Sequence, residues 1–305
     1  MRKLAAYTVV RLASALSWKP PAHRVKELFP ATADATARNA DPNAVYVVTG
    51  ASGGIGATIV EQLHERTAGT VYACCRDPSR APALDRVRPV PLDVRDDASI
   101  AALPAAVGDR VDALWNVGGV LHEGERGPER SLDAVDREWL LKSVDVNCAG
   151  PILVTKALRK ALNAGRRGGA NARPASVVAN LSARVGSISD NGLGASSASE
   201  TFSRLPRRHR RVRAGGWYSY RLSKAALNQA TVTCARELRR QRTICVALHP
   251  GTTDTGLSKP FQARVAPEKL FPVEFTASQL LDIVDGLEED DSGRFIDWAG
   301  ADVEY

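Results

Sequence analysis

The sequence predicts an α/β fold, namely a single Rossmann-type, doubly wound parallel sheet with helices on both faces. Between residues 44 and 305, short apolar runs alternate with segments that place apolar residues three or four positions apart. Such alternation is typical of parallel strands buried between two layers of helices. The first apolar run, AVYVVTG, also leads through a glycine-rich turn, TGASGGIG, into a helical segment. We see no internal repeat and no second domain in this region.

The expected strands are short, apolar and rich in β-branched residues, and several end at Gly or Pro-Gly, as buried parallel strands do. They cover residues 44–50, 70–75, 88–93, 111–119, 175–182, 243–251 and 293–298. The expected helices have an apolar period near 3.6 residues. They cover residues 55–67, 97–107, 132–163 (two consecutive patterns), 218–241 and 276–288.

The net charge of +7 over 305 residues raises the question of a nucleic-acid partner. The excess of positive charge lies in residues 1–43 and 195–214, and the rest of the chain is slightly acidic. A nucleic-acid binder usually carries a basic face on its folded body, so we expect no nucleic-acid partner. The arginine-rich loop leaves two alternatives open, an acidic protein partner or a nucleic acid bound by that loop alone.

The five cysteines fit neither a disulfide framework nor a zinc-site spacing. They are Cys74, Cys75, Cys148, Cys234 and Cys245. We therefore expect a reducing compartment and no metal. The longest apolar stretch near the N-terminus, LAAYTVVRLASALS, is short and contains Arg11, so we expect no membrane span.

Residues 1–43 are expected to be a leader that precedes the domain 44–305. Residues 1–26 contain no Asp or Glu, and a helix would separate their basic from their apolar side chains. This pattern is similar to an organelle transit peptide for a mitochondrion or plastid; an extension of a cytoplasmic protein is the alternative. Residues 195–214 are rich in Ser and Arg and lack an apolar period, so we expect a disordered insertion there.

The glycine-rich turn predicts a dinucleotide-binding site. Its glycines are Gly50, Gly53, Gly54 and Gly56. Glycine permits the tight turn and the close approach of a pyrophosphate to the N-terminus of the following helix. Arg76 follows the second expected strand, where an arginine accommodates the 2′-phosphate of NADP and a carboxylate would bind the ribose of NAD. We therefore expect NADP, with Arg76 facing the ribose and Asp77 pointing away.

A tyrosine and a lysine stand four residues apart in an expected helix, Tyr220 and Lys224, whereas Tyr218 has no such partner. Residues at this spacing share a helix face, so an ammonium would lie beside a phenol. At about 4 Å and an effective dielectric near 20, it would favour the phenolate by roughly 4 kcal/mol, or about three pKa units. The pair predicts a phenol that exchanges a proton near neutral pH; a surface Tyr–Lys pair is the alternative.

Together, TGASGGIG and YRLSK resemble the short-chain dehydrogenase/reductase family, and further motifs match in the family's order over residues 44 to about 300. These motifs are LDV (92–94), NVGG (116–119), VNCAGP (146–151) and HPGTTDT (249–255). The strings NLSARVGSISDN and GGWYSYRLSKAALN are most similar to the carbonyl reductases related to the fly sniffer protein and the bacterial C-signal factor.

The resemblance implies roles for the matching residues. It implies Tyr220 as proton donor, Lys224 beside it, and Asn147 as the support of a proton relay. The implied NADP-binding residues are Gly50, Ser52, Gly54, Ile55, Gly56, Arg76, Asp93, Val94, Asn116, Gly118, Tyr220, Lys224, Pro250, Gly251 and Thr253. Family members commonly pair through the two long helices, here 132–163 and 218–241, so a homodimer or homotetramer is expected.

One position departs from the family's pattern. The carbonyl-orienting serine normally stands three residues before a glycine, but NLSARVG has Ala183 there, with Ser182 one position earlier and Ser187 just after the glycine. Neighbouring residues at a strand end point to opposite sides, so replacement by Ser182 requires a local rearrangement. Ser182 is the best candidate for this catalytic role.

These observations predict an NADPH-dependent carbonyl reductase that acts on a small aldehyde, ketone or quinone. The alternative is an NADP-binding regulatory or scaffold protein with weak or no catalysis, because of Ala183. His249 is expected to be a hydrogen-bonded structural histidine at a strand end, and His122 a solvated loop residue near the site.

Overall fold

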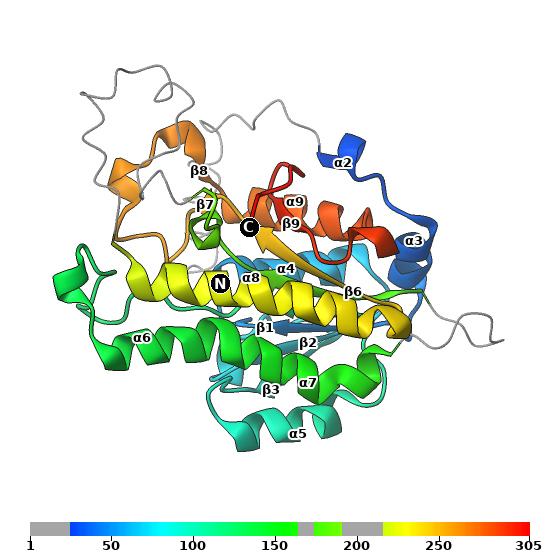
Figure 1. Cartoon of the computed structure of the whole chain (residues 1–305). Helices are drawn as coiled ribbons and strands as arrows, with labels where there is room; N and C mark the ends of the chain where they lie inside the picture. The colour runs from blue at the N-terminus through cyan, green and yellow to red at the C-terminus, as the bar shows by residue number, and fades with distance from the viewer. Residues whose placement is uncertain (1–24, 164–173, 191–215) are drawn as a thin grey trace, which may run out of the picture.

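A seven-stranded parallel sheet forms the centre of the molecule in a computed structural model, which describes residues 25–163, 174–190 and 216–305 (Figure 1). The strand order is β3-β2-β1-β4-β5-β6-β9. The strands are β1 (Val45–Thr49), β2 (Thr70–Cys75), β3 (Val87–Pro91), β4 (Ala113–Asn116), β5 (Ser176–Leu181), β6 (Thr243–His249) and β9 (Phe295–Asp297). The order reverses between β1 and β4, the switch point at which such sheets bind ligands.

Helices cover both faces of the sheet, which confirms the predicted fold class (Figure 1). One face carries α4 (Gly54–Arg66) and α9 (Val273–Asp285). The other carries α5 (Asp97–Val107), α6 (Arg137–Val144), α7 (Gly150–Leu162) and α8 (Tyr218–Leu238). A two-stranded ribbon, β7 (Thr252–Thr253) with β8 (Leu270–Phe271), lies beyond β6. Short helical turns are η1 (Pro78–Arg80), η2 (Leu132–Ala134), η4 (Arg184–Gly186), η7 (Arg239–Gln241), η8 (Gln262–Arg264), η9 (Pro267–Lys269) and η10 (Glu289–Asp291).

A π-helical turn, η3 (Asp145–Ala149), joins α6 directly to α7. The sequence pattern predicts two consecutive helices here, and the structure makes them continuous through this turn. A π-turn inserts one residue into an α-helix and is often found at functional sites. Asn147 lies within it and is fully buried.

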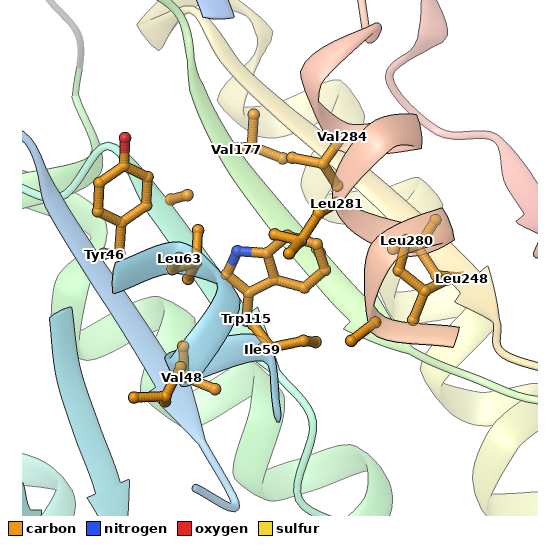
Figure 2. Packing of buried hydrophobic residues seen from close by; sticks show 14 of the residues in the cluster. Tyr46, Val48, Ile59, Leu63, Trp115, Val177, Leu248, Leu280, Leu281 and Val284 are labelled. Atoms are coloured by element: carbon orange, nitrogen blue, oxygen red, sulfur yellow. The ribbon is translucent and has the colours of Figure 1, made fainter. Parts of the chain in front are cut away.

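The larger part of the core lies between the sheet and helices α4 and α9. Trp115 of β4 stands at its centre and is only 1% exposed (Figure 2). Ile59 and Leu63 of α4 and Leu281 and Val284 of α9 belong to the same cluster. Because β4 borders the switch point, this packing holds the strand end that faces the site.

Two N-terminal helices belong to the folded body, α2 (Val25–Leu28) and α3 (Ala33–Ala40). Val25 and Phe29 are 1% and 7% exposed. A Cβ on Gly286 would lie 2.5 Å from the Cβ of Phe29, so the backbone of Phe29 packs closely against the end of α9. The folded part therefore begins well before Ala44, where the sequence pattern placed the boundary of the leader.

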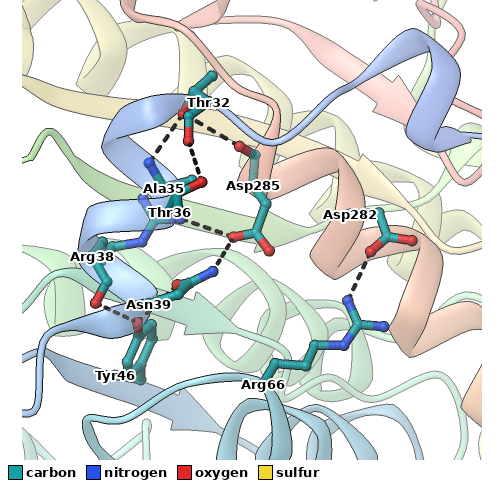
Figure 3. Close-up of polar contacts among 9 residues, drawn as sticks. All are labelled: Thr32, Ala35, Thr36, Arg38, Asn39, Tyr46, Arg66, Asp282 and Asp285. Carbon is teal, nitrogen blue, oxygen red and sulfur yellow. Dashed lines mark hydrogen bonds and ion pairs between the residues drawn. The ribbon is translucent and has the colours of Figure 1, made fainter.

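Asp285 at the end of α9 anchors helix α3 (Figure 3). Its carboxylate accepts hydrogen bonds from Arg38 at 3.1 Å and from Asn39 at 3.0 Å. Its carbonyl accepts from the backbone N–H of Thr32 at 2.9 Å. Tyr46 of β1 donates to the side chain of Asn39 at 2.9 Å. Residues 25–43 are thus tied to both β1 and α9. The acid-free start of the leader, residues 1–24, and the insertion 195–214 lie outside the described residues.

In the described part of the chain, no helix combines the length and the apolarity needed to cross a membrane.

Candidate active site

The glycine-rich turn between β1 and α4 has the shape of a phosphate-binding loop. Gly50 and Gly54 have φ values of 70° and 53°, which favour glycine. A Cβ on Gly56 would lie 2.3 Å from the carbonyl oxygen of Gly50, so no side chain fits there. A Cβ on Gly53, in contrast, would meet nothing within 4 Å. Gly53 also caps α4 without a side-chain bond, so the helix N-terminus offers its N–H groups toward open space, as a pyrophosphate site requires.

Thr49 joins the glycine turn to the end of β4. Its hydroxyl oxygen accepts hydrogen bonds from the N–H groups of Val117 and Gly118, at 3.2 and 3.4 Å. A Cβ on Gly50 would lie 2.6 Å from the Cα of Gly118. The loops that follow β1 and β4 therefore lie in direct backbone contact at the switch point. Ser52 and Ile55 lie in the turn itself and are half-buried.

Arg76 and Asp77 follow β2 and have different environments. The Arg76 side chain is exposed. Asp77 begins the turn η1 and accepts hydrogen bonds from the N–H and the hydroxyl of Ser79, at 3.1 and 2.6 Å. The hydroxyl bond is the main reason that the pKa of Asp77 is lowered. The Asp77 carboxylate is thus bound within its own turn, and the expectation that Arg76 faces the ribose stays a prediction.

Three more predicted cofactor-binding residues lie at or just after the carboxyl ends of strands, and their side chains already contact other residues. Asp93, after β3, accepts from the N–H of Arg95 at 3.0 Å. Val94 packs closely against the start of α7. A Cβ on Gly150 would lie 2.7 Å from the Cβ of Val94. Asn116 is buried and donates to Asn180 of β5 at 2.8 Å. Asn116 therefore supports the floor of the site by linking two strands.

The loop after β6 contains the predicted residues Pro250, Gly251 and Thr253. Gly251 has a φ of 69°, and a Cβ there would lie 2.5 Å from the ring of Phe271. Thr253 is 4% exposed, and its hydroxyl bonds with Thr276 of α9 at 2.9 Å. The Thr253 hydroxyl thus holds the loop against α9 in this structure.

Tyr220, Lys224 and Asn147 are brought together at the carboxyl ends of β4 and β5. The Nζ of Lys224 donates to the carbonyl of Leu181 at 2.6 Å and lies 5.7 Å from the centre of the Tyr220 ring. Asn147 donates to Ser223 of the same helix at 3.0 Å. A Cβ on Gly119 would lie 3.1 Å from the Oδ1 of Asn147 and 3.7 Å from the Nζ of Lys224.

Asn147 also pairs twice with the backbone of Val120. Its Nδ2 donates to the carbonyl at 2.8 Å, and its Oδ1 accepts from the N–H at 2.7 Å. The π-turn places the amide beside this loop. The third hydrogen bond of Asn147, to Ser223, joins it to α8. Asn147 therefore connects the loop after β4 with the helix that carries Tyr220.

Burial dominates the protonation of the Tyr–Lys pair. It raises the pKa of Tyr220 above its usual value of about 10 and lowers the pKa of Lys224 to about 8. From the sequence, Lys224 is expected to lower the pKa of the phenol. In this structure the ammonium lies over the ring and bonds to Leu181, and the effect of burial is the larger one. The phenol therefore keeps its proton here.

The family is decided by comparison with known proteins. The model of the short chain dehydrogenase family matches residues 44–188. The C-signal of Myxococcus xanthus is 31% identical over 195 residues, which cover 64% of this chain and 93% of that protein. The chain belongs to the short-chain dehydrogenase/reductase family. This confirms the resemblance on which the predicted roles depend.

Further relatives extend the match over most of the chain. The 1-hydroxy-2-glutathionyl-2-methyl-3-butene dehydrogenase of Rhodococcus sp. strain AD45 is 29% identical over 255 residues, 82% of this chain and 94% of that protein. An NADPH-bound carbonyl reductase from chicken fatty liver has a TM-score of 0.69 and 28% identity, covering 86% of this chain and 99% of that one. The putative carbonyl reductase Sniffer of Caenorhabditis elegans has a TM-score of 0.65 and 25% identity, covering 87% and 100%.

The hydroxyl of Ser182 is bound to a residue that lies farther along α8 than Tyr220. Ser182 is 2% exposed, and its hydroxyl donates to the Oδ1 of Asn228 at 2.5 Å. Asn228 follows Tyr220 by eight residues on α8, a separation of about 12 Å along a helix. The geometry does not support the expectation that Ser182 replaces the serine missing at Ala183. Ser187 is equally buried and accepts from the N–H of Asp190 at 3.0 Å.

The two histidines near the site make backbone hydrogen bonds. The Nδ1 of His249 accepts from the N–H of Arg184 at 3.3 Å, and burial lowers the pKa of His249 to about 3. His249 is therefore neutral and structural, as predicted. The Nε2 of His122 lies 3.0 Å from the carbonyl oxygen of Gly256.

The sequence does not predict the aromatic side chains, Trp217 and Phe261, that lie beside Tyr220. Trp217 packs edge-on against the Tyr220 ring with centroids 6.3 Å apart, and its ring lies 5.1 Å from that of Phe261. The only sequence signal is the string GGWYSY, because Phe261 lies more than forty residues further along the chain. Among the described residues, His, Cys, Asp and Glu side chains form no cluster of three or more that could hold a metal ion.

Proposed function

We propose that this oxidoreductase is an NADPH-dependent carbonyl reductase that transfers hydride to an aldehyde, ketone or quinone, with Tyr220 as the proton donor. The observation that carries the proposal is that Tyr220, Lys224 and Asn147 lie at the same edge of the sheet as an open glycine turn. The NADPH-bound carbonyl reductase from chicken supports it, because its match extends over 86% of this chain.

The residues fit such a cofactor. The glycine turn would hold the pyrophosphate at the N-terminus of α4, Arg76 the 2′-phosphate, and Asp93 and Val94 the adenine. When bound, NADPH supplies the hydride. The chain supplies a proton from the Tyr220 hydroxyl, which burial keeps protonated before reaction. Lys224 then stabilises the phenolate that forms, and Asn147 holds Val120 and Ser223 in place around the pair.

Turnover of NADPH with a panel of aldehydes, ketones and quinones tests this proposal. An NADP-binding regulatory or scaffold protein is the second candidate, because Ala183 removes the usual carbonyl-orienting hydroxyl and Ser182 is bound to Asn228. Tight NADPH binding without turnover of any carbonyl in the panel would favour that second candidate.

Replacing Arg76 with Ala is expected to reduce the preference for NADPH. The exposed guanidinium would meet the 2′-phosphate, whereas Asp77 is held by Ser79. The parent protein should bind NADPH more tightly than NADH by about tenfold or more, the value of one charge-assisted contact of about 1.4 kcal/mol or above. Isothermal titration with both cofactors measures the ratio. Equal affinities in the parent protein would contradict the assignment.

Introducing serine at position 183 is expected to raise the rate of reduction, while Ser182→Ala should change it little. One added donor to the carbonyl oxygen is worth a factor of about 10² to 10³ when its placement is ideal. Steady-state kcat with a single carbonyl substrate compares Ala183→Ser, Ser182→Ala and the parent. A rate loss of that size in Ser182→Ala would instead make Ser182 the orienting residue.

We propose a homodimer or homotetramer, because apolar side chains remain exposed on the helices through which the family commonly pairs. Leu141 of α6, Ile152 of α7 and Leu222 of α8 are 56%, 36% and 49% exposed. Light scattering gives the mass in solution, and a monomer at micromolar concentration would rule this out.

A further inference from the structure

The N-terminus of α8 is built on a left-handed turn. Gly216 has a φ of 83°, and Trp217 follows with φ 58° and ψ 33°. A residue other than glycine in this region costs roughly 1–2 kcal/mol. Trp217 occupies the N-cap position but makes no side-chain hydrogen bond there. The turn therefore needs support from another part of the chain.

Glu129, in the loop that follows β4, provides this support. Its backbone carbonyl accepts from the N–H of Trp217 at 2.6 Å. Its Oε1 accepts from the N–H of Ser219 at 3.2 Å and also from the Ser219 hydroxyl. A Cβ on Gly216 would lie 2.7 Å from the Glu129 carbonyl oxygen, so the approach requires glycine. Glu129 thus caps the helix from ninety residues away.

The carboxylate is a costly choice for a cap alone. Glu129 is 5% exposed, and its Oε2 has no hydrogen-bond partner among the described residues. A buried oxygen without a partner usually costs 1–3 kcal/mol, and more when charged. The partial positive charge at the start of α8 offsets part of this cost. Most helices obtain the same cap from a local Ser, Thr, Asp or Asn.

We propose that Glu129 is a positioning residue for the catalytic tyrosine. Ser219, which it binds twice, directly precedes Tyr220 in the chain. On the far side, Asn147 binds Ser223, whose hydroxyl donates to the Tyr220 carbonyl at 2.8 Å. Tyr220 therefore stands between two buried supports. Glu129 also fixes the turn that presents the Trp217 ring to the phenol.

The test compares Glu129→Ala, Glu129→Gln and the parent enzyme, and it rests on the proposed reductase activity. Glu129→Ala is expected to lower kcat by roughly 10- to 100-fold, because small misplacements of reacting groups have effects of this size. KM and Kd for NADPH should stay within about twofold, since the glycine turn is untouched. Glu129→Gln keeps an acceptor at Oε1 and should recover most of kcat. A Gln variant as slow as the Ala variant would overturn the capping role.

Thr32→Ala is the matched control. Thr32 caps α3 by accepting from Ala35 at 3.1 Å and donates to the Asp285 carbonyl at 3.4 Å, so it also makes two hydrogen bonds, far from the site. The Thr32→Ala variant should show a similar decrease in melting temperature and a normal kcat. If Glu129→Ala loses no more kcat than Thr32→Ala while both are folded, the cap is merely structural and the inference falls.

Gly216→Ala is the second variant in case Glu129→Ala does not fold. It pushes a methyl group against the Glu129 carbonyl and should lower kcat with unchanged NADPH affinity. A folded Gly216→Ala protein with parental kcat would contradict the inference. An inactive parent enzyme would refute the proposed function first, so the two failures are distinct.

Discussion

Tyr220→Phe is expected to reduce carbonyl turnover by a factor of about 10² to 10⁴, the usual contribution of a positioned proton donor. Phenylalanine keeps the ring between Trp217 and Lys224 but removes the hydroxyl. NADPH should still bind, because the variant leaves the glycine turn and Lys224 intact. Stopped-flow reduction together with a fluorescence titration of NADPH separates the two effects.

Tyr218→Phe is the matched control for this experiment. Tyr218 is adjacent in sequence but is 38% exposed, and it lacks the i+4 lysine. It should therefore keep nearly full activity. Full activity in Tyr220→Phe would overturn the reductase mechanism and leave the NADP-binding scaffold as the better account.

Removing residues 1–43 is expected to destabilise the protein strongly, whereas removing residues 1–24 should not. The longer deletion uncovers the apolar surface now covered by Val25 and Phe29 and takes away the partners of Asp285. These losses are on the order of 5 kcal/mol, or about 10 °C or more in melting temperature. Thermal unfolding of the two truncated proteins and the full chain measures the difference.

Equal melting temperatures for the two truncated proteins would show that α2 and α3 contribute nothing. Otherwise the result constrains the transit peptide that the sequence predicts within residues 1–43. A protease that removed such a peptide would have to cut before Val25, because a cut near Ala44 would delete both helices. The prediction would then apply to residues 1–24, which contain arginine and no Asp or Glu.

Most of the fold could be predicted because the strands are short apolar runs and the long helices carry a periodic apolar pattern. Helix α3 could not. Its sequence, ADATARNA, contains only alanine as an apolar residue and reads like a linker. The residue that it contacts, Asp285, lies almost 250 positions away in the sequence, and no local pattern encodes such a tertiary contact.

In the site, too, features set by local sequence could be predicted and features set by tertiary packing could not. The Tyr220–Lys224 pair follows from local helix geometry, so its proximity could be predicted. The direction of the Ser182 hydroxyl could not, because it depends on Asn228 from a packed helix. The role of Glu129 could not be predicted for the same reason, since its partner Ser219 belongs to an element that is distant in the sequence. The net effect of burial on the Tyr220 pKa also requires the packed structure.

The π-turn Asp145–Ala149 gives this helix a place where its length can change without disturbing the core. A π-turn holds one residue more than the α-helical turn that it replaces, so loss of one codon within it would leave an ordinary α-helix whose later residues keep their orientation. Val154 and Leu158, both fully buried, would stay against the sheet, but Asn147 would lose the position from which it binds Val120. A one-codon deletion here would therefore spare the packing of α7 and remove the support of the Tyr220–Lys224 pair in a single mutational event.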